Sequence, residues 1–224
     1  AMKTMGLSRL CLVQSGEYPQ AEAIARAAGA ADILASALVY KSLDEALMNC
    51  VLVIGTTARA RSLEWPCITP AECARTLLQY SEQGEVALVF GRERSGLTNA
   101  ELDRCRFMTS ISANPEYNSL NLAAAVQVYG HELRQVLEGE PRPTVVPDTD
   151  ELPATGAVME GFYEHLQQAL TDIGVIEADR PHETLLRRLR RLFNRTRLTV
   201  TEVNILRGIL SAVQGRKERR RNAK

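Results

Sequence analysis

The sequence predicts an α/β domain with a mainly parallel sheet, followed by a small helical domain. Short apolar runs alternate with segments of helical periodicity in the first part of the chain, as is typical of parallel strands joined by helices. A stretch rich in proline and acidic residues, 139–157, then interrupts this periodicity and predicts a linker. We therefore expect a sheet domain over residues 1–138, a helical domain over 158–215 and a basic, disordered tail over 216–224.

The strongest strand signals are two unbroken apolar runs. Residues 51–54 read VLVI and residues 86–90 read VALVF. Continuous apolar runs of this length are expected for parallel strands that are covered on both faces. Further strands are expected at 10–13, 32–34, 38–40 and 107–111.

Helix starts are marked by capping signals, in which a serine or threonine is followed three residues later by glutamate. Ser42, Thr98 and Thr199 each begin such a box, and Thr69 precedes a proline at the first helical position. The expected helices cover 20–28, 43–50, 69–80, 120–137, 158–173, 183–193 and 199–213.

Charge is sorted along the chain although the formal net charge is zero. Acids dominate residues 138–179, where Arg142 is the only base, whereas bases outnumber acids about four to one from residue 181 onward. Such sorting predicts an anionic partner for the C-terminal part. We expect nucleic acid rather than a membrane surface, because no long apolar face accompanies the basic residues.

Cysteine usage and hydropathy exclude several protein classes. The five cysteines are odd in number, widely spaced and form no CxxC motif, which argues against a disulfide framework or a zinc site and favours a reduced, cytoplasmic setting. No apolar run approaches the roughly 18 residues of a membrane span, and the start of the chain shows no signal-peptide pattern. We expect neither a metal nor a membrane partner.

Three loops rich in small and polar residues follow the three strongest strands. They read GTTARAR (55–61), GRERSGLT (91–98) and SANPEYNSLN (112–121). Ligands of open α/β sheets bind outside the carboxyl ends of the strands, so these loops are candidates for a ligand rim. The alternative is ordinary strand–helix turns, in which glycine serves only the backbone geometry.

The second and third loops are the more informative. GRERSGLT begins like a phosphate-binding loop, but Leu97 stands where that motif requires lysine, which disfavours a nucleotidase. The third loop carries four serine and asparagine residues between Asn114 and Asn121, and a single helix cap needs only one of them. The surplus predicts a polar site.

Two longer segments carry a family resemblance. VFGRERSGLTNAEL (89–102) and SANPEYNSLNLAAAVQVYGHELR (112–134) resemble the second and third motifs of the TrmH-like SPOUT RNA methyltransferases, and the likeness extends through NILRGIL (204–210). The resemblance implies a homodimer with a deep trefoil knot that binds S-adenosylmethionine. It also implies 2′-O-methylation of cytidine or uridine at nucleotide 32 of the tRNA anticodon loop, without a metal.

The resemblance assigns roles to individual residues. Glu93, Ser119 and Asn121 match the catalytic residues. Ile111 and Leu120 would enclose the adenine of the cofactor, and the full set of expected cofactor contacts is Thr56, Thr57, Ala58, Gly91, Gly96, Ile111, Asn118, Ser119 and Leu120. RNA contacts are expected from Arg59, Arg92, Arg94, Arg187, Arg188, Arg190 and Arg191.

The reaction places three demands on these residues. The methyl group must lie in line with the ribose oxygen, and positioning alone can lower the barrier by about 7–11 kcal/mol. The 2′-hydroxyl must lose its proton or its developing charge must be stabilised. The RNA phosphate must also be held still.

Two alternatives stay open. Arg92 and Arg94, and the four arginines between 187 and 191, can also be read as solvated charged faces. The family's first strand and first-motif arginine have no counterpart here, and residues 1–6 read as a helix end with Gly6 as its terminal glycine, so we expect that an element before residue 1 is missing. The alternative function is a SPOUT-fold RNA-binding module with impaired catalysis.

Overall fold

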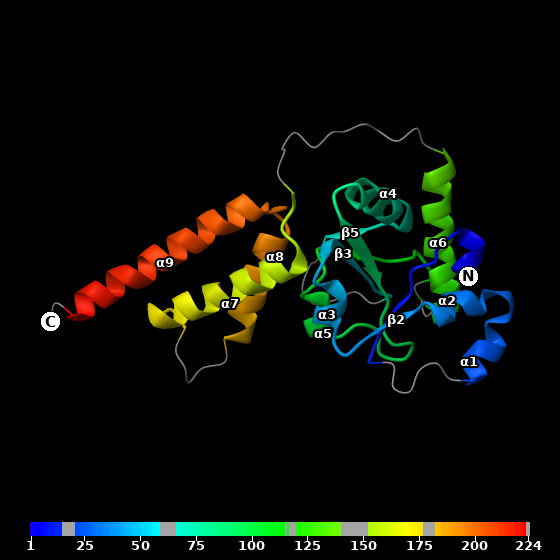
Figure 1. Cartoon of the computed structure of the whole chain (residues 1–224), viewed down its shortest axis with the longest axis horizontal. Helices are drawn as coiled ribbons and strands as arrows, with labels where there is room; N and C mark the ends of the chain where they lie inside the picture. Colours follow the sequence, from blue (N-terminus) through cyan, green and yellow to red (C-terminus); the bar gives the residue numbers. More distant parts are fainter. Residues whose placement is uncertain are drawn as a thin grey trace.

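The structure, a computed structural model, describes residues 1–14, 21–58, 66–114, 116, 120–139, 152–176 and 182–222. Figure 1 shows a sheet domain with a helical unit attached at one side, from which the C-terminal helix projects. The strands are β1 (Cys11–Val13), β2 (Leu38–Tyr40), β3 (Cys50–Thr56), β4 (Cys67–Ile68), β5 (Glu85–Val89) and β6 (Phe107–Thr109). The helices are η1 (Lys3–Met5), α1 (Ala21–Arg26), η2 (Ala28–Ala30), α2 (Ala31–Ala35), α3 (Leu43–Leu47), α4 (Pro70–Ser81), α5 (Asn99–Leu102), α6 (Leu122–Gly139), α7 (Gly156–Asp172), α8 (Glu183–Asn194) and α9 (Val200–Asn222).

The main sheet has four parallel strands in the order β4-β6-β3-β5, and a separate parallel pair joins β1 to β2. The central strand β3 carries alternating side chains to two cores. Leu52 and Ile54 pack with residues of α4 and α6, whereas Val53 packs with Leu47 of α3. This burial on both faces explains the unbroken apolar run, and the predicted mainly parallel α/β domain is confirmed. The trefoil knot stays a prediction.

One strand prediction was wrong, and one strand of the structure was not predicted. Residues 32–34 lie in helix α2 instead of a strand. Their alanine-rich surroundings favour a helix, and the segment buries only one side chain, Ile33, as one helical face requires. The two-residue strand β4 was not predicted, because it is too short to show alternation.

The helical unit has its own core. Phe162 and Val203 are buried where α7 packs against α9, and the rings of Phe162 and Phe193 meet edge-on with centroids 4.9 Å apart. Helix α7 begins at Gly156, inside the predicted linker, and the Thr155 side chain caps it. Helix α9 continues to Asn222, so the predicted helix end at residue 213 and the disordered tail from 216 were wrong for the backbone of 216–222.

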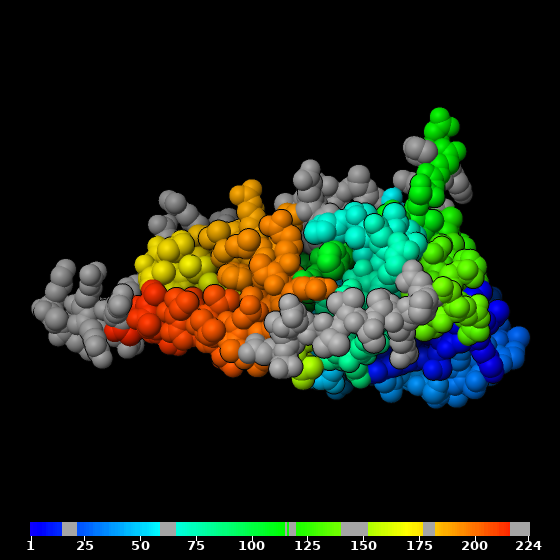
Figure 2. Space-filling model, turned by 90° about the horizontal axis from the view of Figure 1, so that it is seen from above, coloured from blue at the N-terminus to red at the C-terminus, as the bar shows by residue number. Residues whose placement is uncertain are grey.

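The helical unit docks on the sheet domain through hydrogen bonds and ion pairs. The Ala157 amide donates to the Met48 carbonyl at 3.1 Å, and the Asn194 side-chain amide donates to the Asp103 carbonyl at 3.2 Å. Figure 2 shows the two parts forming one elongated body, with the helical unit in yellow to red. No helix among the described residues is long and apolar enough to cross a membrane.

Candidate active site

The three predicted loops begin at the carboxyl ends of β3, β5 and β6, which are neighbours in the sheet. The first loop is tied to both neighbouring strands. The Thr56 hydroxyl donates to the Val89 carbonyl at 3.1 Å, and the Thr57 amide donates to the Thr109 carbonyl at 3.0 Å. The ends of the three strands are thereby held together, as a rim for one ligand requires. Ala58 follows this anchor, whereas Arg59 lies outside the described residues.

The second loop folds back on itself. The Arg92 amide donates to the Gly96 carbonyl at 3.3 Å, and the Gly96 amide donates to the Arg92 carbonyl at 2.7 Å. Gly91 has no room for a side chain, because a Cβ atom there would lie 2.2 Å from the Gly96 carbonyl carbon. Gly96 has φ +68°, which favours glycine, and open space surrounds the position of its absent Cβ. Both glycines thus shape the loop.

Leu97 shows why this loop does not bind phosphate in the manner of a nucleotidase. Its side chain is buried with Leu102 and Met108. Immediately after it, Thr98 caps α5 in a full capping box with Glu101. A lysine in place of Leu97 would bury its ammonium group among apolar side chains, so leucine belongs to the packing of this fold.

The second and third loops meet through Glu93 and Asn121. The Asn121 side-chain amide donates to Glu93 Oε1 at 2.9 Å. Asn121 Oδ1 accepts the amides of Ala123 at 2.9 Å and Ala124 at 3.4 Å, so the same side chain caps α6. Both side chains are exposed to solvent. Two catalytic candidates that are 28 residues apart in sequence therefore form one exposed, hydrogen-bonded pair at the N-terminus of a helix.

The remaining candidates of the third loop are divided. Ile111 is half-buried and packs against the main core, whereas Leu120 is 41% exposed. Asn118 and Ser119 lie outside the described residues, so their predicted contacts stay predictions.

Thr109 is fully buried, and its hydroxyl accepts a hydrogen bond from Tyr129 at 3.2 Å, which fixes the end of β6. Burial raises the pKa of Tyr129 to about 12, so the phenol stays protonated as donor.

The predicted RNA-binding arginines differ in their surroundings. Arg92 pairs with Glu101 at 3.0 Å, and this pair raises the pKa of Arg92. Arg187 pairs with the buried Asp103 at 2.7 Å, which joins α8 to the sheet domain. Arg190 pairs with Glu160, with one oxygen at 2.8 Å, and stacks 4.2 Å from the ring centroid of Tyr163.

Arg94 and Arg188 are exposed, and Arg191 is half-buried on α8. The alternative interpretation of the α8 arginines as one solvated face is wrong for Arg187 and Arg190, because these two side chains hold the helical unit together and to the sheet domain. Sequence reasoning missed Asp103 and Glu160 as their partners, because neither lies at a fixed spacing from the arginines.

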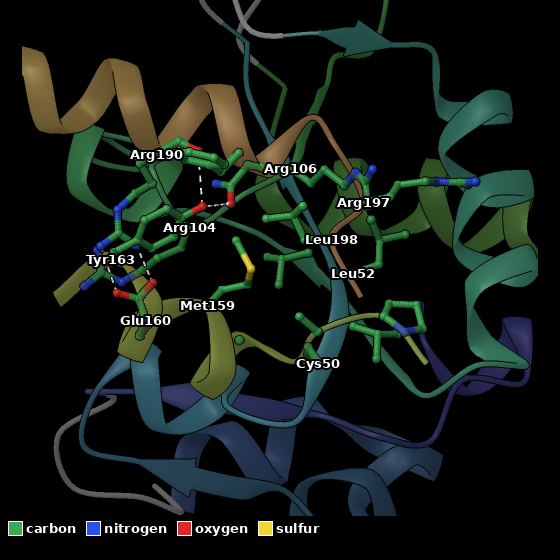
Figure 3. A pocket seen from close by; sticks show the side chains of 17 residues that line it. Cys50, Leu52, Arg104, Arg106, Met159, Glu160, Tyr163, Arg190, Arg197 and Leu198 are labelled. Atoms are coloured by element: carbon green, nitrogen blue, oxygen red, sulfur yellow. Dashed lines mark hydrogen bonds and ion pairs between the residues drawn. The ribbon is translucent and has the colours of Figure 1, made fainter. Parts of the chain in front are cut away.

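A cavity of about 80 Å³ lies between β3, α7 and α8. Figure 3 shows its lining, in which Arg104, Arg190, Glu160 and Tyr163 gather on one side, and Arg106 and Arg197 on the other. It does not include the Glu93–Asn121 pair. In the part of the chain that the structure describes, no three His, Cys, Asp or Glu side chains are grouped to hold a metal ion.

Comparison with known proteins matches both parts of the chain. Residues 1–131 match the family described as "SpoU rRNA Methylase family", and residues 157–223 match "tRNA methyltransferase TrmJ, C-terminal domain". A Pseudomonas aeruginosa protein named tRNA (cytidine/uridine/adenosine-2′-O-)-methyltransferase TrmJ is 48% identical over 222 residues, which cover 96% of this chain and 86% of that protein. A Photorhabdus laumondii protein named tRNA (cytidine/uridine-2′-O-)-methyltransferase TrmJ is 48% identical over 215 residues, which cover 96% and 88% of the two chains. The crystal structure of TrmJ from Z. mobilis superposes with a TM-score of 0.80 at 32% identity, covering 95% of this chain and 90% of that one.

Proposed function

Because the chain belongs to the SpoU methylase family, whose members are S-adenosylmethionine-dependent methyltransferases, we propose that it methylates the ribose 2′-hydroxyl of cytidine or uridine in tRNA, at nucleotide 32 of the anticodon loop. The observation that carries the proposal is the Glu93–Asn121 hydrogen bond at 2.9 Å, which brings the candidate residues of two loops together. The match of residues 157–223 to the TrmJ C-terminal domain supports tRNA as the substrate.

The rim of three loops suits the methyl donor. Thr56 and Thr57 are anchored by the neighbouring strands, and Gly96 exposes backbone without a side chain in the way. Ile111 and Leu120 offer apolar surface for an adenine. S-adenosylmethionine supplies an activated methyl group on a sulfonium, and it has no phosphate chain that would need a lysine in place of Leu97.

The chain's own contribution to the reaction is positioning. The Asn121 amide fixes the Glu93 carboxylate beside the first turn of α6, where helix amides carry partial positive charge. A carboxylate and an amide held in this way can orient a ribose hydroxyl, accept its proton and stabilise the charge that develops on its oxygen. Ser119 is proposed to act beside them.

We further propose that the protein acts as a homodimer in the cytoplasm. A second copy would complete the RNA-binding surface, to which Arg59, Arg94 and Arg188 are expected to contribute. Size-exclusion chromatography with light scattering measures the dimer directly, and a monomeric mass at micromolar concentration would contradict this part of the proposal.

The test is to map ribose methylation on tRNA transcripts. Matched transcripts would carry cytidine, uridine, adenosine or 2′-deoxycytidine at nucleotide 32, and mass spectrometry of nuclease fragments would locate the added methyl group. We expect methylation of the two pyrimidines and none of the deoxynucleotide. The adenosine transcript tests the wider range in the name of the Pseudomonas aeruginosa relative. A methyl group on a base or on another ribose would contradict the proposal, and binding without transfer would support the RNA-binding module instead.

A further inference from the structure

Two arginines from different parts of the chain share one aromatic ring where the helical unit meets the sheet domain. The guanidinium carbon of Arg197 lies 4.5 Å from the ring centroid of Tyr80, and that of Arg106 lies 5.6 Å from the same centroid. Arg106 precedes β6, Arg197 belongs to the turn between α8 and α9, and Tyr80 lies in α4. Three distant segments thus bring two positive charges together.

Among the described residues, these two arginines differ from Arg104, Arg187 and Arg190 in having no carboxylate partner. Arg104 is paired with Asp44, and Arg187 and Arg190 also have carboxylate partners. Within the described parts of the chain, neither Arg106 nor Arg197 forms an ion pair. The guanidinium of Arg106 donates to the carbonyl of Arg195, at 3.5 Å, and its buried Nε has no hydrogen-bond partner among the described residues.

Burial makes the missing counter-charge costly for Arg106. Its guanidinium is largely removed from water, which lowers the pKa of Arg106 to about 10. The contacts with the rings of Tyr80 and Phe107 offset only part of this cost, because an aromatic face is a weak partner for a cation. A buried cation is normally paired and hydrogen-bonded, so Arg106 is incomplete without an anion.

The site also has open space beside it. Arg106 lines both the cavity of about 80 Å³ that it shares with Arg197 and a smaller hollow that it shares with Arg191 and Arg195. Figure 3 shows Arg106 and Arg197 on the same side of the larger cavity, away from the paired Arg104 and Arg190. Arg191 of α8 and Arg195 and Arg197 of the following turn therefore line the same two hollows as Arg106.

The backbone of Arg197 points to a role for its side chain. Its φ is +53°, a conformation that favours glycine over arginine. The turn is held by the hydroxyl of Thr196, which donates to the Phe193 carbonyl at 2.8 Å, and by the Ala154 amide, which donates to the Leu198 carbonyl at 2.8 Å. The strained position thus fixes the direction in which the guanidinium leaves the turn.

We propose that Arg106 and Arg197, with the exposed Arg195 beside them, form a phosphate-binding site that holds a phosphodiester of the bound RNA at the junction of the two domains. This inference rests on the proposed function for its RNA partner. It assigns contacts with the RNA backbone to arginines that the sequence analysis did not single out. Arg187 and Arg190, by contrast, form ion pairs within the protein. The planar guanidinium forks suit the oxygens of a phosphodiester.

The test is the salt dependence of tRNA binding by Arg197→Gly and Arg106→Gln, with Arg26→Gln as a control. Glycine adopts a φ of +53° without strain, so Arg197→Gly removes the charge without destabilising the turn. Arg26 is exposed and pairs with Glu22 on α1, which Figure 1 places across the sheet domain from α8. Fluorescence anisotropy with labelled tRNA, without S-adenosylmethionine, would give the dissociation constant over a series of salt concentrations.

Each junction variant should lower the slope of log affinity against log salt by about 0.7–0.9, the contribution of one phosphate contact, whereas the control keeps the wild-type slope. In turnover, the KM for tRNA should rise with little change in kcat. An unchanged slope for Arg197→Gly, with its thermal unfolding intact, would overturn the proposal even if Arg106→Gln failed to fold.

Inorganic phosphate distinguishes a small-anion site from an RNA site. Thermal protection of the wild type by phosphate, lost in both variants while the tRNA slopes stay unchanged, would assign the site to a free anion and overturn the RNA assignment. Because tRNA binding is measured apart from methyl transfer, the experiment distinguishes failure of this phosphate site from failure of the proposed function. Reduced slopes without ribose methylation would refute only the function, and methylation with unchanged slopes would refute only this site.

Discussion

Asn121 has two roles in the structure, and substitution can separate them. Its Oδ1 caps α6 by accepting two backbone amides, and its Nδ2 donates to Glu93. Asn121→Ala removes both interactions. Asn121→Ser removes the side-chain amide that donates to Glu93 but keeps an oxygen that can cap the helix, because serine and asparagine are comparably good caps.

The expected magnitudes of the two roles differ widely. Loss of the cap in Asn121→Ala should lower the free energy of unfolding by about 1 kcal/mol, which corresponds to a fall in Tm of about 2–4 °C for a chain of this size. The hydrogen bond to Glu93 joins exposed side chains and should add little to stability. Loss of a positioned donor at a reacting centre, by contrast, typically costs about 10²–10³ in rate.

We therefore expect both variants to lose methyl transfer on the order of 10²–10³-fold, while only Asn121→Ala loses stability. Single-turnover transfer of labelled methyl groups to tRNA would measure the rate, and thermal unfolding by circular dichroism would measure the stability. Turnover of Asn121→Ser equal to that of the wild type would refute a catalytic role for the side-chain amide. Loss of activity only in Asn121→Ala would make the residue a structural cap.

Three further predictions follow from other parts of the structure. Gly91→Ala should unfold the second loop and abolish cofactor binding in calorimetry, because its Cβ would overlap the backbone of Gly96. Gly96→Ala should lower the free energy of unfolding in urea by only about 1 kcal/mol. Equal effects of the two substitutions would contradict this geometry. Asp103→Asn should weaken the docking of α8 and lower the free energy of unfolding by about 2 kcal/mol, and an unchanged urea midpoint would contradict a role for this pair. Burial raises the pKa of the three buried thiols, to about 11 for Cys50 and about 12 for the other two, so the folded state holds their protons above pH 9 while the unfolded state loses them. Stability should therefore fall between about pH 9 and 12, as measured by denaturant titration, and a flat profile would show that the thiols are not buried as described.

The long apolar runs of β3 and β5 were predictable as strands, and the shorter β1 and β2 were also predicted, whereas the segment at 32–34 was misassigned and β4 was missed. The apolar runs of β3 and β5 are long enough to exclude a surface helix, and the structure bears both out. The segment at 32–34 has the same apolar character over too few residues, and its helical state depends on Ile33 reaching a core that only the folded chain provides. A short apolar run therefore does not by itself distinguish a strand from a helix.

The candidate site was predictable to the level of loops but not of contacts. Parallel strands place their carboxyl ends on one edge of the sheet, so the proximity of the loops that carry Glu93 and Asn121 could be predicted from the sequence. Their hydrogen bond depends on the fold-back of the second loop at Gly96 and on where α6 begins, and neither follows from spacing. The surplus of serine and asparagine in the third loop indicated a polar site, but one of them, Asn121, proved to supply the helix cap as well.

Helix α5 shows how the candidate active site and the helical unit are connected. Glu101, the third residue of this single turn, pairs with Arg92, which is next to Glu93, and Asp103, the residue that ends the turn, pairs with Arg187 of α8. Leu102 between them is fully buried, so the turn is anchored in the core of the sheet domain. A shift of α8 on RNA binding would therefore strain the Asp103 ion pair before it moved Glu93. Substitution of Asp103 should change the stability of docking and the KM for tRNA, with little change in kcat, whereas substitution of Asn121 should do the reverse.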